Sequence, residues 1–191
     1  MIATLIATMM IPGGLSAETP LSCPVMPASN ANFKGVKVDY SGVRVAFCCG
    51  GCDATFSSNP GKFLNGKDTK GKVYGYSLFD PVTMMPVVAE KAKGSTDYMG
   101  VRYYFLSEDN KAAFAKDMKK FGAMPKKESL FCPVSGEAIE GYAKAAGYAD
   151  VDGTRFYLCC ADCVPAFAKD PKGYAEKNKS KVTAPKAIKV K

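Results

Sequence analysis

Eight cysteines are the residues of this chain best suited to chemistry, and they form two clusters with the same spacing. Each cluster has one isolated cysteine, a long gap and then Cys-Cys-x-x-Cys; the members are Cys23, Cys48, Cys49 and Cys52, and Cys132, Cys159, Cys160 and Cys163. Distant cysteines that meet at the end of a hairpin can form a tetrahedral thiolate site. All-sulfur ligation favours zinc, copper(I) or an iron–sulfur cluster, and disfavours calcium and magnesium. The spacing therefore predicts two bound ions per chain, either zinc or copper(I).

Not all four cysteines of a cluster are expected to play the same part. Because side chains alternate along a strand, two adjacent cysteines face one ion only if the chain turns there. We therefore expect Cys23, Cys48 and Cys52 to form the core of the first site, with Cys49 as a fourth ligand or a spare thiol. The equivalent residues of the second site are Cys132, Cys159 and Cys163, with Cys160 in the place of Cys49. Met84, Met85 and Met99 are further candidate ligands for copper(I), although we favour core packing for them.

Two other interpretations of the cysteines stay open at this point. Eight cysteines in an exported protein can form four disulfides, which would make the chain a disulfide-stapled interaction module without metal. Each Cys-x-x-Cys can also act as a thiol–disulfide oxidoreductase when one thiol is acidic and exposed. The oxidoreductase is the weaker alternative, because no βαβ pattern surrounds either motif.

The chain contains no histidine. This excludes a histidine-dependent catalytic triad and a histidine-rich metal site, because the commonest general base and the commonest nitrogen ligand are both missing. We expect a binding protein that is not an enzyme.

The cysteine clusters belong to a pattern that occurs three times. Gly42–Phe63 aligns without a gap with Gly153–Tyr174, and Gly100–Phe121 aligns with both. An upstream tripeptide opens each copy: Cys23-Pro24-Val25, Asp80-Pro81-Val82 and Cys132-Pro133-Val134. Such a period predicts three related modules of about 50 residues, each too small to be stable without metal, disulfides or neighbours.

The middle copy has Leu106, Ser107 and Asn110 where the other two have cysteines. It is therefore expected to bind no metal and to serve as a structural spacer. We divide the chain into a signal-peptide-like segment at 1–17, a first module at 18–75, a second at 76–127, a third at 128–176 and a basic tail at 177–191.

Each copy contains a predicted β-hairpin. Val36–Tyr40 alternates in polarity, Ser41-Gly42 supplies a turn, and Val43–Phe47 forms the second strand. The equivalent turns and second strands are Met99-Gly100 before Val101–Phe105, and Asp152-Gly153 before Thr154–Leu158. Glycine supplies the positive φ that a tight hairpin turn needs.

A short helix is predicted after each hairpin, over Asp53–Ser58, Lys111–Lys116 and Val164–Lys169. Pro60 and Pro171 end the outer two, because the residue before proline avoids helical geometry. The cysteine clusters would then lie at helix N-termini, where amide groups and the helix dipole stabilise thiolates. The fold class is therefore α+β, built from tandem ββα modules.

Aromatic residues and arginines recur at fixed positions of the three copies. We expect the aromatic residues to form the module cores; they are Phe56, Phe63, Phe114, Phe121, Phe167 and Tyr174. We expect Arg44, Arg102 and Arg155 to be structural, through packing or a carboxylate partner.

These motifs resemble the YHS/TRASH group of domains. The outer modules, with Cys-Pro-Val and a later Cys-x-x-x-Cys ahead of Phe and Asn/Asp-Pro, look like the TRASH form. The middle module, with Asp80-Pro81-Val82, Tyr103-Tyr104-Phe105 and Ser107, is similar to the YHS form. The resemblance implies a treble-clef-like ββα fold, three-cysteine metal sites in the outer modules, and a role in heavy-metal handling or sensing with a protein partner.

The apolar run at 2–11, followed by Pro12-Gly13-Gly14 and the small residues Ser16-Ala17, resembles a secretory signal peptide. The run is too short to span a bilayer. We expect a periplasmic or secreted protein with no transmembrane helix in the mature chain. No lysine or arginine precedes the run, so a buried strand or helix is the alternative.

The net charge is +8, and much of the excess lies in Lys177–Lys191, which has no acidic residue. This composition predicts a solvated, flexible tail. The tail could bind an anionic surface, but without interleaved aromatic residues no nucleic-acid partner is expected.

Overall fold

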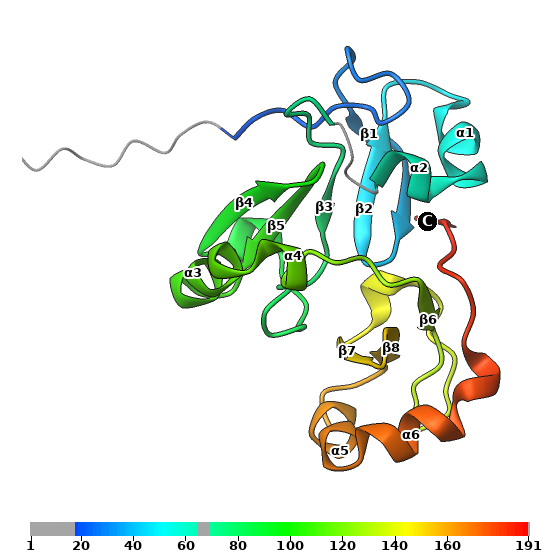
Figure 1. Ribbon diagram of the computed structural model, residues 1–191. Helices are drawn as coiled ribbons and strands as arrows, with labels where there is room; N and C mark the ends of the chain where they lie inside the picture. Colours follow the sequence, from blue (N-terminus) through cyan, green and yellow to red (C-terminus); the bar gives the residue numbers. More distant parts are fainter. Residues whose placement is uncertain (1–17, 65–68, 191) are drawn as a thin grey trace, which may run out of the picture.

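Three antiparallel β-hairpins are the repeated feature of the computed structural model, which describes residues 18–64 and 69–190 (Figure 1). The hairpins are β1 (Asn32–Tyr40) with β2 (Val43–Phe47), β4 (Gly94–Tyr98) with β5 (Val101–Phe105), and β7 (Gly147–Val151) with β8 (Thr154–Leu158). The three predicted hairpins are therefore confirmed. The segment at 1–17, predicted to be a signal peptide, lies outside the described residues.

Two residues with positive φ make each hairpin turn. The φ angles are 50° and 78° at Ser41-Gly42, 48° and 81° at Met99-Gly100, and 49° and 76° at Asp152-Gly153. Positive φ at both central residues matches the right-handed twist of the flanking strands. The predicted glycine turns therefore form as the sequence indicates.

An arginine–aspartate pair crosses each hairpin at the same register position. The Nε–Oδ1 distances are 2.8 Å for Arg44–Asp39, 2.8 Å for Arg102–Asp97 and 2.9 Å for Arg155–Asp150. In each pair Nη2 donates a second hydrogen bond, to the other carboxylate oxygen, at 2.9 Å. Such two-point pairing fixes the register as well as the charge. The prediction that these arginines are structural is confirmed.

Two short helices follow each hairpin. They are α1 (Cys52–Ser58) and α2 (Pro60–Leu64), α3 (Glu108–Lys116) and α4 (Met118–Phe121), and α5 (Cys163–Lys169) and α6 (Pro171–Lys177). The first helix of each outer pair ends before proline, as predicted, with Asn59 and Asp170 at the break. The second helices were not predicted; Asp117 and Asp170 cap two of them by accepting hydrogen bonds from Lys120 N and Gly173 N.

The repeated aromatic residues lie in the cores, as predicted. Phe56, Phe114 and Phe167 are buried, and in the outer modules the aromatic residue of the next helix packs on them. The ring centroids are 5.7 Å apart for Phe56 and Phe63, and 5.9 Å apart for Phe167 and Tyr174. Phe121 packs, partly buried, against the core that the first two modules share.

The first two modules share one sheet. The six-stranded sheet has the order β4-β5-β3-β2-β1-β9, in which the short strand β3 (Gly75–Ser77) runs parallel to β5 and antiparallel to β2. The third module has its own sheet, ordered β6-β8-β7, with β6 (Lys127–Ser129) parallel to β8. The predicted divisions at 75/76 and 127/128 thus fall within β3 and β6. Helices and mixed sheets confirm the α+β class, and the treble-clef assignment stays a prediction.

The C-terminal segment is not a free tail, so that prediction is wrong for the residues that the structure describes. After the 3₁₀ turn η3 (Lys179–Lys181), the chain runs back from the third module to the first (Figure 1), where β9 (Ile188–Lys189) pairs with β1. Lys189 Nζ also lies 2.8 Å from Asp53 Oδ2. Val182 and Ile188 pack against the core of the third module, and these apolar side chains between the lysines explain the docking.

A buried carboxyl group joins the returning chain to two modules. Glu128 is 2 % exposed; it accepts hydrogen bonds from Tyr142 Oη, in the 3₁₀ turn η2 (Tyr142–Lys144), and from Ser41 Oγ in the first hairpin turn. Tyr142 Oη also lies 2.8 Å from the carbonyl oxygen of Lys186. Burial raises the pKa of Glu128, and the bond from Tyr142 partly offsets this.

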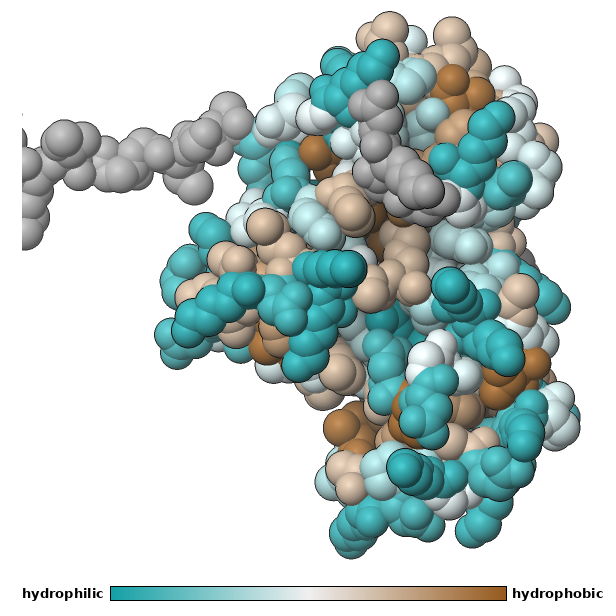
Figure 2. All heavy atoms as spheres, viewed as in Figure 1, coloured by the Kyte–Doolittle hydropathy of each residue, from teal (hydrophilic) through white to brown (hydrophobic). Residues whose placement is uncertain are grey.

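Hydrophilic residues cover much of the molecular face in Figure 2, and the apolar patches between them are small and separate. None of the helices in the described residues, which include the remaining 3₁₀ turn η1 (Ala89–Lys91), is long and apolar enough to cross a membrane.

We predict that Tyr142→Phe lowers the free energy of unfolding by about 1–3 kcal/mol, because it leaves a buried acceptor of Glu128 without its partner. Urea denaturation of the full chain measures this. Tyr174→Phe is the control, because it removes a hydroxyl from a partly exposed ring that stays stacked on Phe167. Equal losses in the two variants would contradict the role of the Glu128–Tyr142 bond.

Candidate metal centres

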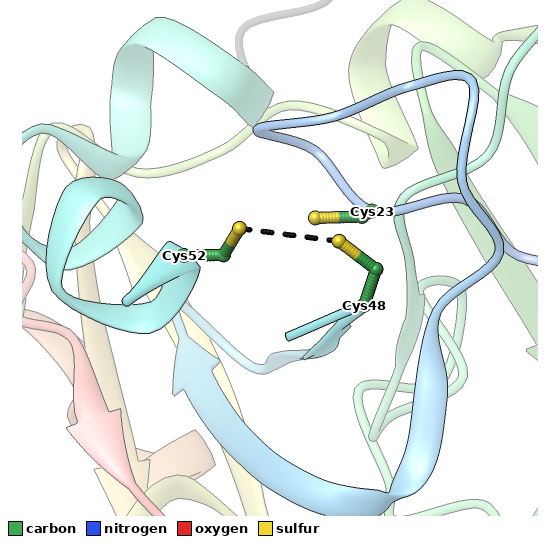
Figure 3. A group of neighbouring side chains, drawn as sticks. All are labelled: Cys23, Cys48 and Cys52. Carbon is green, nitrogen blue, oxygen red and sulfur yellow. Dashed lines mark hydrogen bonds between the residues drawn. The ribbon is translucent and has the colours of Figure 1, made fainter. Parts of the chain in front are cut away.

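Three cysteines from separate elements converge in the first module, and we call them the first centre. Cys23 precedes β1, Cys48 directly follows β2, and Cys52 is the first residue of α1. Figure 3 shows the three thiols pointing toward one another, and their Sγ atoms all lie within 4.8 Å of each other. The Sγ–Sγ distance between Cys48 and Cys52 is 4.0 Å. Such a group of sulfur atoms is placed to hold a metal ion.

The second centre repeats this arrangement in the third module. Cys132 precedes the hairpin, Cys159 follows β8, and Cys163 is the first residue of α5. Their Sγ atoms also lie within 4.8 Å of one another, and the Sγ–Sγ distance between Cys159 and Cys163 is 3.7 Å. In both centres the first and last cysteines are buried and the middle one is partly exposed.

The loop before each hairpin explains why the first cysteine reaches the others. Cys23 N donates to Ser29 O at 2.9 Å, and Cys132 N donates to Glu137 O at 2.8 Å. Short antiparallel bridges, Ser22–Asn30 and Phe131–Ala138, close the two loops. We call these two closed loops, residues 22–30 and 131–138, the knuckles. Each knuckle places its cysteine at the end of the hairpin.

The two extra cysteines lie at the edge of the centres, and both are exposed. Cys49 Sγ lies 3.6 Å from Cys48 Sγ and 3.5 Å from Cys52 Sγ. Cys160 Sγ lies 3.0 Å from Cys163 Sγ. Of the eight predicted ligands, six thus form the two triads, and the other two are close enough to serve as fourth ligands.

Backbone N–H groups surround the residue that opens the tripeptide of each copy, and the middle module shows them most clearly. Asp80 is fully buried; its Oδ1 accepts from the N–H groups of Val82 at 2.9 Å and Thr83 at 3.4 Å. Its Oδ2 accepts from Leu106 N at 2.8 Å and from Asn110 Nδ2 at 2.6 Å. All four partners are donors, so an ionised carboxylate satisfies them.

We call the three backbone N–H groups the amide cage, and the outer modules have it at the equivalent positions. In the third module it is formed by Val134, Ser135 and Cys159 and faces the thiol of Cys132. Burial raises the pKa of Cys132, but the hydrogen bonds from Ser135, Cys159 and Val134 outweigh burial and lower this pKa to about 7.

The amide cage of the first module likewise lowers the pKa of Cys23. Burial raises the pKa of the Cys23 thiol, but hydrogen bonds from the backbone N–H groups of Cys48, Met26 and Val25 outweigh burial and bring the pKa below its ordinary value. The cage therefore favours a thiolate, the form that binds metal.

The pKa of the last cysteine of each triad is raised, in contrast to that of the first. The neighbouring thiol of Cys49, then burial and the nearby Cys23, raise the pKa of Cys52 to about 12. Burial, then the thiols of Cys160 and Cys132, raise the pKa of Cys163. Crowded sulfur atoms resist a second negative charge, and a bound cation removes that resistance.

Sequence reasoning missed one neighbour of the first centre, Met26. Its Sδ lies 3.7 Å from Cys48 Sγ. Met84 packs against the core of the third module, as we favoured. Met99 is 47 % exposed, so core packing is wrong for that residue. The position of Met26, three residues after Cys23 and aligned with Ser135, was the available signal.

Comparison of the chain with protein-family models, with curated proteins and with solved structures found no match. The resemblance to YHS/TRASH domains therefore stays a prediction from the motifs.

We predict that Asp80→Asn lowers the free energy of unfolding by about 1.5–3 kcal/mol, because it replaces a charged acceptor of the amide cage by an amide. Asp109→Asn, at an exposed position of α3, is the matched control. Urea denaturation of the full chain compares the two, and an unchanged midpoint for Asp80→Asn would contradict an anion-binding cage.

Proposed function

We propose that this protein binds two soft metal ions, zinc or copper(I), one at each centre, and that it handles these ions in an exported compartment, either periplasmic or secreted. The observation that carries the proposal is the amide cage. The same three N–H groups face a carboxylate in the middle module and a cysteine thiol in the outer modules. A site built for an anion, with two further thiols within 4.8 Å, suits thiolate ligation of a cation.

The donor set supports the proposed metals. Each centre presents three sulfur atoms, and an exposed fourth, from Cys49 or Cys160, lies within 3.5 Å or 3.0 Å of one of them. Thiolates select zinc or copper(I) over calcium, magnesium and manganese. Recruitment of the fourth thiol would complete a tetrahedral zinc site.

The exposure of the centres supports handling of the ion and not only structural use of it. Cys48 and Cys159 are partly exposed, and Cys49 and Cys160 are exposed beside them. A partner protein can therefore approach the sulfur atoms from solvent and exchange the ion by replacing one thiolate at a time. We propose no catalytic step, so the protein acts as a carrier, scavenger or metal-presenting module.

The alternative as a thiol–disulfide oxidoreductase finds less support. The strands that flank α1 are β2 and β3, and they pair antiparallel. The Cys49–Cys52 motif therefore does not lie in a βαβ unit, the context in which such motifs do redox chemistry.

Metal content tests the proposal. We predict that protein purified anaerobically, and loaded with zinc or copper(I), holds two ions per chain. Cys52→Ser and Cys163→Ser should each remove one ion, because each removes one thiolate of a triad. Asn110→Ala, at the equivalent position of the middle module, should remove none. Elemental analysis beside a free-thiol count measures this.

Other outcomes of that experiment would overturn the proposal. No bound metal with all eight thiols oxidised would indicate a disulfide-stapled interaction module. Disulfide-reductase turnover would indicate the oxidoreductase. Equal metal loss in all three variants would show that the middle module is not a spacer.

A gain-of-site variant tests the equivalence of the modules. We predict that the triple variant Asp80→Cys, Leu106→Cys, Asn110→Cys binds a third ion, because it places thiols at the three positions that align with a triad, beside the same amide cage. The same three positions changed to serine form the control. A folded triple-cysteine variant that still holds two ions would contradict the equivalence.

A further inference from the structure

Each centre has three cysteines in the same arrangement, but the two centres differ in one neighbouring side chain. Met26 lies three residues after Cys23, and Ser135 lies three residues after Cys132. Met26 Sδ is 3.7 Å from the Sγ of the middle cysteine, Cys48, and Ser135 Oγ is 3.3 Å from the Sγ of its counterpart, Cys159. Each centre therefore has one non-cysteine donor atom beside the same thiol.

The backbone holds this position firmly in both modules. The N–H groups of Met26 and Ser135 are members of the amide cage and bond to the first cysteine of their triad. Met26 O also accepts from Ser29 N at 2.8 Å within the knuckle. The Met26 side chain starts from an anchored backbone, so it reaches the centre without a rearrangement of the loop.

Packing does not account for the placement of the Met26 side chain. Met26 is 49 % exposed, and it belongs to neither of the two hydrophobic cores of the described residues. Its sulfur atom lies 3.7 Å from the sulfur of the partly exposed Cys48. This contact is what a ligand at the open side of the centre would make.

Thioether and hydroxyl differ in the metal that they favour. A thioether is a soft, neutral ligand that copper(I) accepts, whereas protein zinc sites use thiolate, imidazole and carboxylate ligands. A hydroxyl oxygen is a hard donor and adds nothing to copper(I) binding. The two cysteine triads are alike, but the first centre offers copper(I) an additional thioether and the second offers only a hydroxyl.

We propose that Met26 makes the first centre selective for copper(I), whereas the second centre, with Ser135, holds zinc through thiolates alone. This inference rests on the proposed function, because it requires that both centres bind soft metal ions. The chain then carries two different ions at two specialised centres.

The test uses full-length chains in which one centre is active. Cys163→Ser leaves the first centre, and Cys52→Ser leaves the second. Anaerobic competition with a chromophoric copper(I) chelator, and separately with a zinc chelator, gives the affinity of each centre for each ion. The first centre should show the higher ratio of copper(I) to zinc affinity.

Met26→Leu is the decisive variant, because it keeps the size of the side chain and removes the sulfur. It should lower the copper(I) affinity of the first centre by about tenfold or more and leave its zinc affinity unchanged. X-ray absorption at the copper edge should then show fewer sulfur neighbours. Ser135→Met should raise the copper(I) affinity of the second centre, and Ser135→Ala is its control.

The outcomes separate this inference from the proposed function. Suppose that Met26→Leu in the Cys163→Ser chain leaves the copper(I) affinity and the number of sulfur neighbours unchanged. Met26 is then no ligand and the inference is overturned, while the two metal centres stand. If neither centre of the parent chains binds zinc or copper(I), the proposed function fails and the inference with it.

Discussion

The amide cage at the start of each module is the interaction on which the rest of the structure depends. Backbone N–H groups that are buried must find acceptors, and here three of them converge on one side chain. In the middle module that acceptor is the carboxylate of Asp80, and in the outer modules it is the thiol of Cys23 or Cys132. One backbone arrangement thus accepts either a carboxylate or a thiol.

This shared cage explains how one module architecture accommodates a carboxylate in one copy and three cysteines in each of the others. In the middle module, Asp80 joins the loop between Phe79 and Pro86 to the end of β5 through Leu106 N, and to α3 through Asn110. In the outer modules the corresponding three positions are cysteines, and a metal ion would join the same three segments. A module of about 50 residues buries little apolar surface, so such a link adds to the support that its neighbours give.

The modules also stabilise each other through backbone pairing. Strand β3 completes a sheet between the first and second hairpins, and β9 returns the end of the chain to β1. Glu128, buried between Ser41 and Tyr142, fastens the third module to the first. These contacts hold the scaffold together, while Cys49 and Cys160 stay exposed at the edges of the two centres.

Local patterns in the sequence predicted the elements and the composition of the centres. Apolar alternation and the Ser41-Gly42 type of turn act over a few residues, so the three hairpins formed where expected. The triple repeat grouped the cysteines into two sets before any contact was known. It also predicted that Arg44, Arg102 and Arg155 are structural. Their aspartate partners could be identified only from the pairing of the two strands in each hairpin.

By itself, the sequence determined what recurs: three hairpin–helix modules, two of them with cysteines at fixed positions. Only the tertiary structure decided what depends on contacts between distant segments. The basic C-terminal segment reads as solvated because lysines dominate it, yet Val182 and Ile188 dock it and β9 pairs with β1. The meeting of Asp80 with Asn110, and of Met26 with Cys48, likewise depends on how a loop folds onto a hairpin end. Such contacts join residues tens of positions apart, and no local periodicity encodes them.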